Sequence, residues 1–225
     1  MEIINFLFPN MSGKGSELLL SFLQTIWMMF VSGTIAFLIG ITFGVVLIVT
    51  AKGGILENIA VWSVVDKTIN FFRSIPFIIL IVLLIPLTRF VVGTAIGTTG
   101  AMLPLVFGTA PFFTRQMQAA LSEIDKGMIE AASAMGLRAR AIIFRVYLKE
   151  SISPIIRGAT ITFINLVGLT AMAGAVGAGG LGDFAIRYGY QRYQTDVTVV
   201  TVLILIAMVT IIQTLGDYII KKTTH

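Results

Sequence analysis

Five long stretches without a charged residue constrain this chain more than any other feature. They are Leu18 to Ala51, Ser74 to Thr88, Phe90 to Thr114, Gly158 to Gly182 and Val197 to Gly216. A helix needs about 20 mostly apolar residues to cross the hydrocarbon core of a bilayer. Only 12% of the residues are charged, against about 25% in ordinary soluble domains. The sequence therefore predicts an all-α membrane protein.

Four of these stretches are long enough to span a bilayer without help. The second reaches that length if its helix begins near Thr68 and Arg73 extends its guanidinium into the headgroups. We therefore predict five transmembrane helices. The first stretch is longer than one crossing requires, so its helix is expected to tilt or to project beyond the membrane.

The basic residues are distributed unevenly over the predicted loops. Five helices with alternating loops leave four Lys or Arg on one side: Lys14, Arg89, Arg187 and Arg192. They place twelve on the other: Lys52, Lys67, Arg73, Arg115, Lys126, Arg138, Arg140, Arg145, Lys149, Arg157, Lys221 and Lys222. The richer side is cytoplasmic by the positive-inside rule. The N-terminus is thus predicted outside and the C-terminus inside, and the net charge of +5 reflects topology rather than nucleic-acid binding.

The chain lacks the residues that most enzyme and metal sites require. It has no cysteine, and its one histidine is His225, so thiol chemistry, a Ser-His triad and a His/Cys metal site are excluded. No G-x-x-x-x-G-K-[ST] phosphate loop is present. We predict a non-enzymatic chain with no catalytic residue, no metal and no cofactor of its own. With no linker or repeat, residues 1–225 are predicted to form a single domain.

A basic segment between the third and fourth predicted spans, Arg115 to Arg157, is the longest polar interruption. Inserting the six Lys or Arg from Lys126 onward would cost on the order of 15 to 20 kcal/mol, so the segment is predicted to stay in the cytoplasm. Apolar residues recur every three or four positions before and after Gly136, which predicts two short helices joined there. Glycine suits a left-handed helix end.

Two interpretations of this hairpin follow from composition: an amphipathic element lying on the headgroups, or a docking element for a cytosolic partner. Alanines 131 and 132 keep the first helix thin, so another protein can approach its backbone. The segment resembles the E-A-A-x3-G-x9-I-x-L-P signature of permease subunits of ABC importers. The matching residues are Glu130-Ala131-Ala132, then Gly136 after three residues, Val146 after nine more, and Leu148 after one more. Val146 replaces isoleucine, and Lys149 replaces the final proline.

That resemblance implies that the hairpin is a coupling helix whose contact with a nucleotide-hydrolysing subunit involves Glu130, Ala131, Ala132 and Gly136. The segment from Leu169 to Val197 further resembles methionine-importer permeases. This implies a homodimer in a bacterial inner membrane, two cytosolic ATPase subunits that hold ATP and Mg, and an external binding protein that delivers methionine. Related permeases share the glycine-rich part, so another small solute is the alternative.

One face of the predicted fourth span carries Asn165, Gly168, Leu169, Met172 and Val176 at helical spacing. Either this face makes an interhelical hydrogen bond and packs a core methionine, or it lines the pathway with Met172 in an apolar gate. Residues 177–182 match the dinucleotide fingerprint G-x-G-x-x-G, but no strand precedes them as that motif requires. Close backbone packing and a flexible helix end are the better interpretation.

The predicted outer loop contains Arg187, Tyr188, Tyr190, Arg192 and Tyr193. These residues are either interfacial anchors or the contact for an external binding protein, and both interpretations remain open. Two rival functions also remain. A self-sufficient channel or secondary carrier commonly buries ionisable residues, which the uncharged stretches lack. A scaffold without transport explains the hairpin but not the glycine-rich fourth span.

Overall fold

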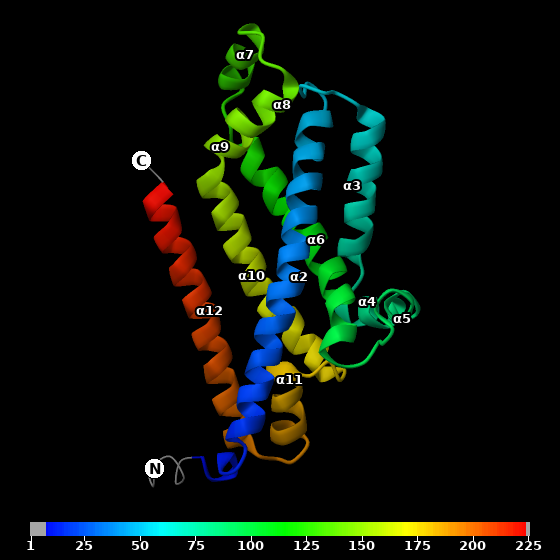
Figure 1. Cartoon of the computed structure of the whole chain (residues 1–225), viewed down its shortest axis with the longest axis vertical. Coiled ribbons are helices and arrows are strands. Elements are labelled where there is room, and N and C mark those ends of the chain that lie inside the picture. The colour runs from blue at the N-terminus through cyan, green and yellow to red at the C-terminus, as the bar shows by residue number, and fades with distance from the viewer. Residues whose placement is uncertain (1–7, 224–225) are drawn as a thin grey trace. The chain divides into compact units, whose positions relative to one another are not determined.

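The computed structural model describes residues 8–223, and every regular element in that part of the chain is helical. Figure 1 shows the elements along the chain. In order, they are η1 (Pro9–Met11), α2 (Gly15–Thr50), α3 (Ile59–Ser74), α4 (Phe77–Leu83), α5 (Ile85–Val92), α6 (Gly97–Ser122), α7 (Lys126–Ala134), α8 (Ala139–Ile142), η2 (Ile143–Tyr147), α9 (Leu148–Glu150), α10 (Ile152–Ala175), α11 (Gly180–Phe184), η3 (Ala185–Tyr190) and α12 (Thr195–Thr223). The all-α prediction is confirmed.

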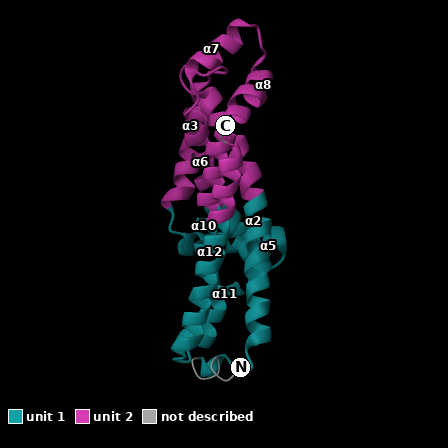
Figure 2. Cartoon of the chain, turned by 90° about the vertical axis from the view of Figure 1, so that its left-hand side faces the viewer, with its two compact units in different colours: residues 1–34, 75–108, 163–212 teal, residues 35–74, 109–162, 213–225 magenta. Residues whose placement is uncertain are grey.

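The chain divides into two compact units, coloured separately in Figure 2. Unit 1 comprises residues 1–34, 75–108 and 163–212, and unit 2 comprises residues 35–74, 109–162 and 213–225. Helices α2, α6, α10 and α12 each contribute residues to both units, and the single-domain prediction stays a prediction. All twelve Lys and Arg residues predicted to be cytoplasmic belong to unit 2, and the other four belong to unit 1.

Three helices, α2, α10 and α12, are each long and apolar enough to cross a membrane. The pair α5 and α6 meets the same criteria together, but it is bent by 117°. Helices α2, α6, α10 and α12 coincide with the first, third, fourth and fifth predicted stretches, and α5 begins within the second. The count of five spans stays a prediction.

The expectation of one helix from Thr68 to Thr88 is wrong, because this stretch is divided among α3, α4 and α5. Pro76 precedes α4, and Pro86 lies in the first turn of α5. Proline has no N–H to donate, and it disfavours helical backbone in the residue before it. Even when extended back to Thr68, this stretch does not form one helix, because its prolines interrupt it.

The core of unit 2 joins α2, α6 and the basic segment after α6. Phe113, Met117 and Leu121 of α6 are buried with Ala132, Ile142 and Tyr147. Gly40 and Gly44 of α2 lie directly against Phe113 and Met117, where even a Cβ atom would not fit. This spacing of small residues allows two helices to approach closely, so α2 and α6 are firmly packed here.

Large apolar side chains also cover the outside of the long helices. Phe30 of α2 is 66% exposed, and Ile206 of α12 is 56% exposed. Many other large apolar side chains are exposed as well, and a soluble domain rarely gathers exposed apolar surface into large patches. Such helix faces suit contact with lipid or with other subunits in the membrane.

Candidate functional site

Helix α7 presents the predicted coupling segment in unit 2. The Asp125 side chain caps its N-terminus by accepting a hydrogen bond of 2.8 Å from the Gly127 N–H. At the other end, Gly136 has φ of +78°. The Gly136 N–H donates to the Ser133 carbonyl at 3.0 Å and the Leu137 N–H donates to the Ala132 carbonyl at 3.2 Å, which is a Schellman helix end. The predicted left-handed conformation of Gly136 is confirmed.

The two alanines of the motif face different surroundings. Ala132 is buried in the unit 2 core, and only 3% of it is exposed. The expectation that both alanines offer surface to a partner is therefore wrong for Ala132, whereas Ala131 is exposed and Glu130 is exposed beside it. Met128 and Met135, at helical spacing from Ala131, are also exposed. Their methyl and thioether groups make an apolar strip suited to adaptable protein contacts.

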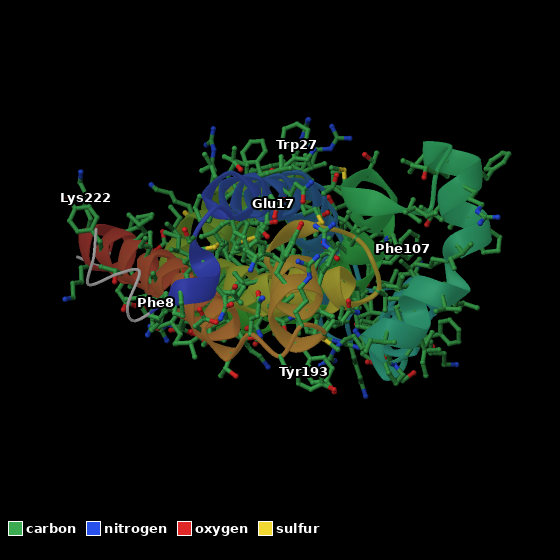
Figure 3. All side chains as sticks on the ribbon, turned by 90° about the horizontal axis from the view of Figure 1, so that it is seen from below. Phe8, Glu17, Trp27, Phe107, Tyr193 and Lys222 are labelled. Atoms are coloured by element: carbon green, nitrogen blue, oxygen red, sulfur yellow. The ribbon has the colours of Figure 1, made fainter. Side chains whose placement is uncertain are left out.

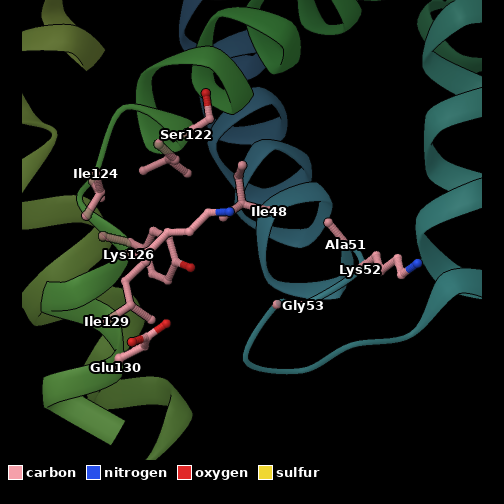
Figure 4. Close-up of a pocket in the computed structure, with 12 residues that line it drawn as sticks. Ile48, Ala51, Lys52, Gly53, Ser122, Ile124, Lys126, Ile129 and Glu130 are labelled. Atoms are coloured by element: carbon pink, nitrogen blue, oxygen red, sulfur yellow. The ribbon is translucent and has the colours of Figure 1, made fainter.

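A cavity of about 240 Å³ lies between α7, the end of α6 and the turn after α2. Figure 4 shows Lys126 reaching from α7 toward Ile48, whereas Lys52 points away. Tyr147 also lines the cavity, and burial raises the pKa of its hydroxyl. Because the ordinary pKa is already near 10, Tyr147 stays neutral at physiological pH, and the α7 region carries no tyrosinate charge.

The predicted pathway face of α10, with Val176 directly after the end of the helix, forms an exposed strip in unit 1. Asn165 and Gly168 are exposed, Met172 is 40% exposed and Val176 is 49% exposed. No atom lies within 4 Å of a Cβ built on Gly168. The opposite faces of α10 are buried, as Leu166 and Ala173 show. The residues do share one open face, and its role as a pathway stays a prediction.

The glycine-rich segment makes a tight elbow between α10 and α11. Gly177, Gly179 and Gly180 have positive φ, and Cβ atoms on Gly174 or Gly182 would collide with the backbone of the opposing helix. The predicted close backbone packing is confirmed.

The elbow is also bonded to α2. Gln24 and Thr25 accept hydrogen bonds of 2.8 and 2.9 Å from the N–H groups of Gly180 and Leu181. Because α10 rather than a strand precedes the elbow and these two N–H groups already have partners, the segment does not offer the phosphate cradle of a dinucleotide site.

Three cationic side chains surround the ring of Tyr188 in the predicted outer loop. The Arg187 and Arg192 guanidinium carbons each lie 4.8 Å from its ring centroid, and Lys14 Nζ lies 5.8 Å away. A hydrogen bond with the Glu17 carboxylate raises the pKa of Tyr188, and the two arginines act in the opposite direction. Arg187 also pairs with Asp183 at 3.1 Å.

The other two tyrosines of this loop point outward. Tyr190 is 74% exposed and Tyr193 is 94% exposed, and Figure 3 shows Tyr193 projecting from the chain. Tyr193 has φ of 54°, a conformation that costs a residue with a Cβ about 1–2 kcal/mol. Interfacial anchoring and binding-protein contact both remain open for this loop.

Sequence reasoning missed several residues that the structure brings together. Asp125 carried a usable signal, since aspartate is a preferred N-cap before a helix. Gln24 and Thr25 carried none, because their partners lie 156 residues away. Arg115 was predicted only to border a span, yet it pairs with Asp66 of α3 at 2.6 Å.

Known proteins resemble this chain over most of its length. A probable D-methionine transport system permease protein MetI from Vibrio cholerae is 44% identical over 202 residues, which is 90% of each chain. The methionine import system permease protein MetP from Bacillus subtilis is 46% identical over 173 residues, covering 77% of this chain and 78% of that protein.

The fold is likewise similar to a solved structure. An inward-facing conformation of the MetNI methionine ABC transporter matches with a TM-score of 0.92 at 44% identity, covering 94% of this chain and 98% of that chain. The family model for the binding-protein-dependent transport system inner membrane component matches residues 40–225. The chain belongs to this family of binding-protein-dependent transport system inner membrane components.

Proposed function

We propose that this chain is the permease subunit of an ATP-driven ABC importer that carries methionine into the cytoplasm. The observation that carries the proposal is 44% identity over 90% of the chain to a D-methionine transport permease. The exposed surface of α7 supports it, since an importer permease must present a docking element to its ATPase. Two copies of the chain, two cytosolic ATPase subunits and an external binding protein make up the proposed assembly.

In this proposal, the energy for transport comes from ATP hydrolysis by the ATPase subunits, which hold ATP and Mg. ATP-driven closure of the ATPase pair moves α7 and opens the pathway outward. The α10 strip of Asn165, Gly168, Met172 and Val176 lines that pathway. It contains no Arg, Lys, Asp or Glu to pair with the charged groups of an amino acid, so selectivity resides mainly in the external binding protein.

An importer permease for another small solute is the alternative function, and a self-sufficient channel or secondary carrier is a more distant one that the polar contacts of the helices do not favour. Ion-coupled carriers commonly keep an ionisable group in the membrane for the coupling ion. The uncharged stretches contain no such group, and Asp66, a partly buried carboxylate at the border of the predicted second span, is paired with Arg115 at 2.6 Å. A carboxylate paired in this way is a poor site for a coupling ion.

Uptake by the reconstituted complex tests the function. Proteoliposomes with this chain, its ATPase and its binding protein should accumulate labelled methionine only when ATP is on the ATPase side. Omitting the binding protein should abolish uptake, and competition by L- and D-methionine should show the stereoselectivity. Uptake of another small solute in place of methionine would support the alternative substrate. Uptake by this chain alone in an ion gradient would overturn the proposal.

The proposed topology has five spans, an N-terminus outside and a C-terminus inside. The segregation of twelve Lys and Arg residues into unit 2 and four into unit 1 supports it, given the positive-inside rule. Residues 1–7 and 224–225 lie outside the described part of the chain, so the test uses Ser12 and Lys222, which are exposed. In this cysteine-free chain, Ser12→Cys should react with an impermeant maleimide in intact cells. Lys222→Cys should react only after permeabilisation, and labelling of both in intact cells would contradict the topology.

Met172→Gly should raise the ATP-independent leakage of small solutes. Removing an apolar side chain from a constriction allows water to persist there. The measurement is efflux of a small fluorescent or labelled solute from proteoliposomes without ATP. Ile206→Gly is the control, since Ile206 is also exposed on a long helix and suffers the same loss of helix propensity, about 1 kcal/mol. Equal leakage in both variants would favour a packing role for Met172.

A further inference from the structure

Four polar side chains connect α3 to α6 within unit 2. The Arg115 Nη2 group donates to Asp66 Oδ1 at 2.6 Å and to Asn70 Oδ1 at 2.8 Å, and Nη1 donates to Gln118 Oε1 at 2.6 Å. Asn70 Nδ2 donates to Asp66 Oδ2 at 3.0 Å. Both carboxylate oxygens and both terminal nitrogens of the guanidinium are therefore engaged. We call these four residues the α3–α6 clamp.

The ion pair within the clamp is partly buried, although Asn70 at its edge is exposed. The side chains of Arg115 and Asp66 are only 21% and 18% exposed. Fully exposed ion pairs contribute little to stability, whereas removing one partner of a buried pair leaves an uncompensated charge and is strongly destabilising. The Asp66–Arg115 pair is intermediate between these two cases, so loss of either partner should weaken the attachment of α3 to α6.

Helix α3 buries little of its own surface within the described chain. Ile69 is its one buried residue, while Val64 and Phe71 are 66% and 59% exposed. A helix normally gains most of its stability by packing an apolar face. Since α3 buries so little, the clamp provides an unusually large share of its attachment to α6.

Helix α6 is joined at its C-terminal end to the coupling segment. Met117 and Leu121 are fully buried in the core that also contains Ala132 of α7 and Tyr147. Packed cores are dense and transmit displacement. A movement of α7 therefore carries the end of α6 with it, and the clamp lies on that same part of α6.

We propose that the α3–α6 clamp is the positioning element that makes α3 move together with α7 during transport. The proposal rests on the proposed ATP-driven function. Asp66 and Arg115 are positioning residues, because they act through α3 and α6 rather than on the solute. Without the clamp, α7 moves while α3 lags, and ATP hydrolysis is no longer fully converted into transport.

Asp66→Asn should reduce the methionine carried per ATP hydrolysed by roughly fivefold or more, the lower end of a typical coupling between sites. The swap Asp66→Arg with Arg115→Asp should restore much of the ratio, because Asn70 and Gln118 carry both donors and acceptors. Lys67→Gln is the matched control, since the exposed Lys67 neighbours Asp66 and makes no ion pair among residues 8–223. Its ratio should stay at the wild-type value.

Spin labels at Val64→Cys on α3 and Glu123→Cys after α6 give a readout that stability alone would not change. In the complete complex with the wild-type clamp, the distance between the two labels should be the same in the nucleotide-free state and in the ATP-trapped state. In the Asp66→Asn variant, this distance should differ between the two states. A wild-type distance that changes with ATP would overturn the clamp, as would an Asp66→Asn variant with wild-type distances and ratio. Failure of the wild-type complex to carry methionine would instead refute the proposed function, since the distances require only ATP.

Discussion

Gly182→Ala should destabilise the protein and abolish most of its transport. Alanine is better than glycine in a helix by about 1 kcal/mol, so local propensity alone predicts the opposite. A Cβ on Gly182, however, would lie against the backbone oxygen and Cα of Ala171 in α10. A backbone segment cannot rotate away as a side chain can, so α10 and α11 must separate. Overpacking of this kind typically costs about 1–3 kcal/mol.

The displacement also breaks the bonds that attach α11 to α2. The Gly180 and Leu181 N–H groups donate to Gln24 and Thr25 over short distances, and each buried N–H left unpaired costs about 1–3 kcal/mol. We expect a lower unfolding temperature in detergent and more than a tenfold drop in reconstituted uptake. Gly15→Ala is the control, because Gly15 has open space around it and no positive φ. Equal stability of the two variants would contradict the tight elbow.

The long helices show how much of the fold could be predicted from the sequence. Uncharged stretches located α2, α10 and α12, because a bilayer demands length and apolarity that few other structures share. The same criterion failed between Thr68 and Thr88, where two prolines outweigh the apolar run. At this point proline is the stronger determinant, because it breaks a helix however long the apolar stretch is.

Site residues were predictable where the cause is local. Gly136 was assigned correctly because a left-handed helix end favours glycine whatever surrounds it. Ala132 was misjudged because its burial depends on Phe113 and Tyr147, which only the fold brings to α7. Asp66 and Arg115 are separated by 49 residues, and no local pattern marks them as partners.

Gly136→Val should uncouple ATP hydrolysis from transport while leaving the helices in the membrane. The φ of +78° at Gly136 costs a residue with a Cβ about 1–2 kcal/mol, and a β-branched residue is the least tolerant. Nothing lies within 4 Å of a Cβ at this position, so backbone strain rather than a clash causes the effect. The strain favours loss of the Schellman hydrogen bonds, and the exposed strip of Met128, Ala131 and Met135 loses its fixed direction.

A graded series separates strain from the mere presence of a side chain. Asparagine visits the left-handed region more readily than other residues, so Gly136→Asn should keep most of the uptake, Gly136→Ala less and Gly136→Val least. About 1.4 kcal/mol corresponds to a factor of ten, so we expect Gly136→Val to lower uptake by roughly tenfold while the complex still hydrolyses ATP. Glu130→Arg should also uncouple, because it reverses an exposed charge beside the strip without changing the backbone. Normal uptake per ATP in both Gly136→Val and Glu130→Arg would show that α7 does not couple the ATPase to transport.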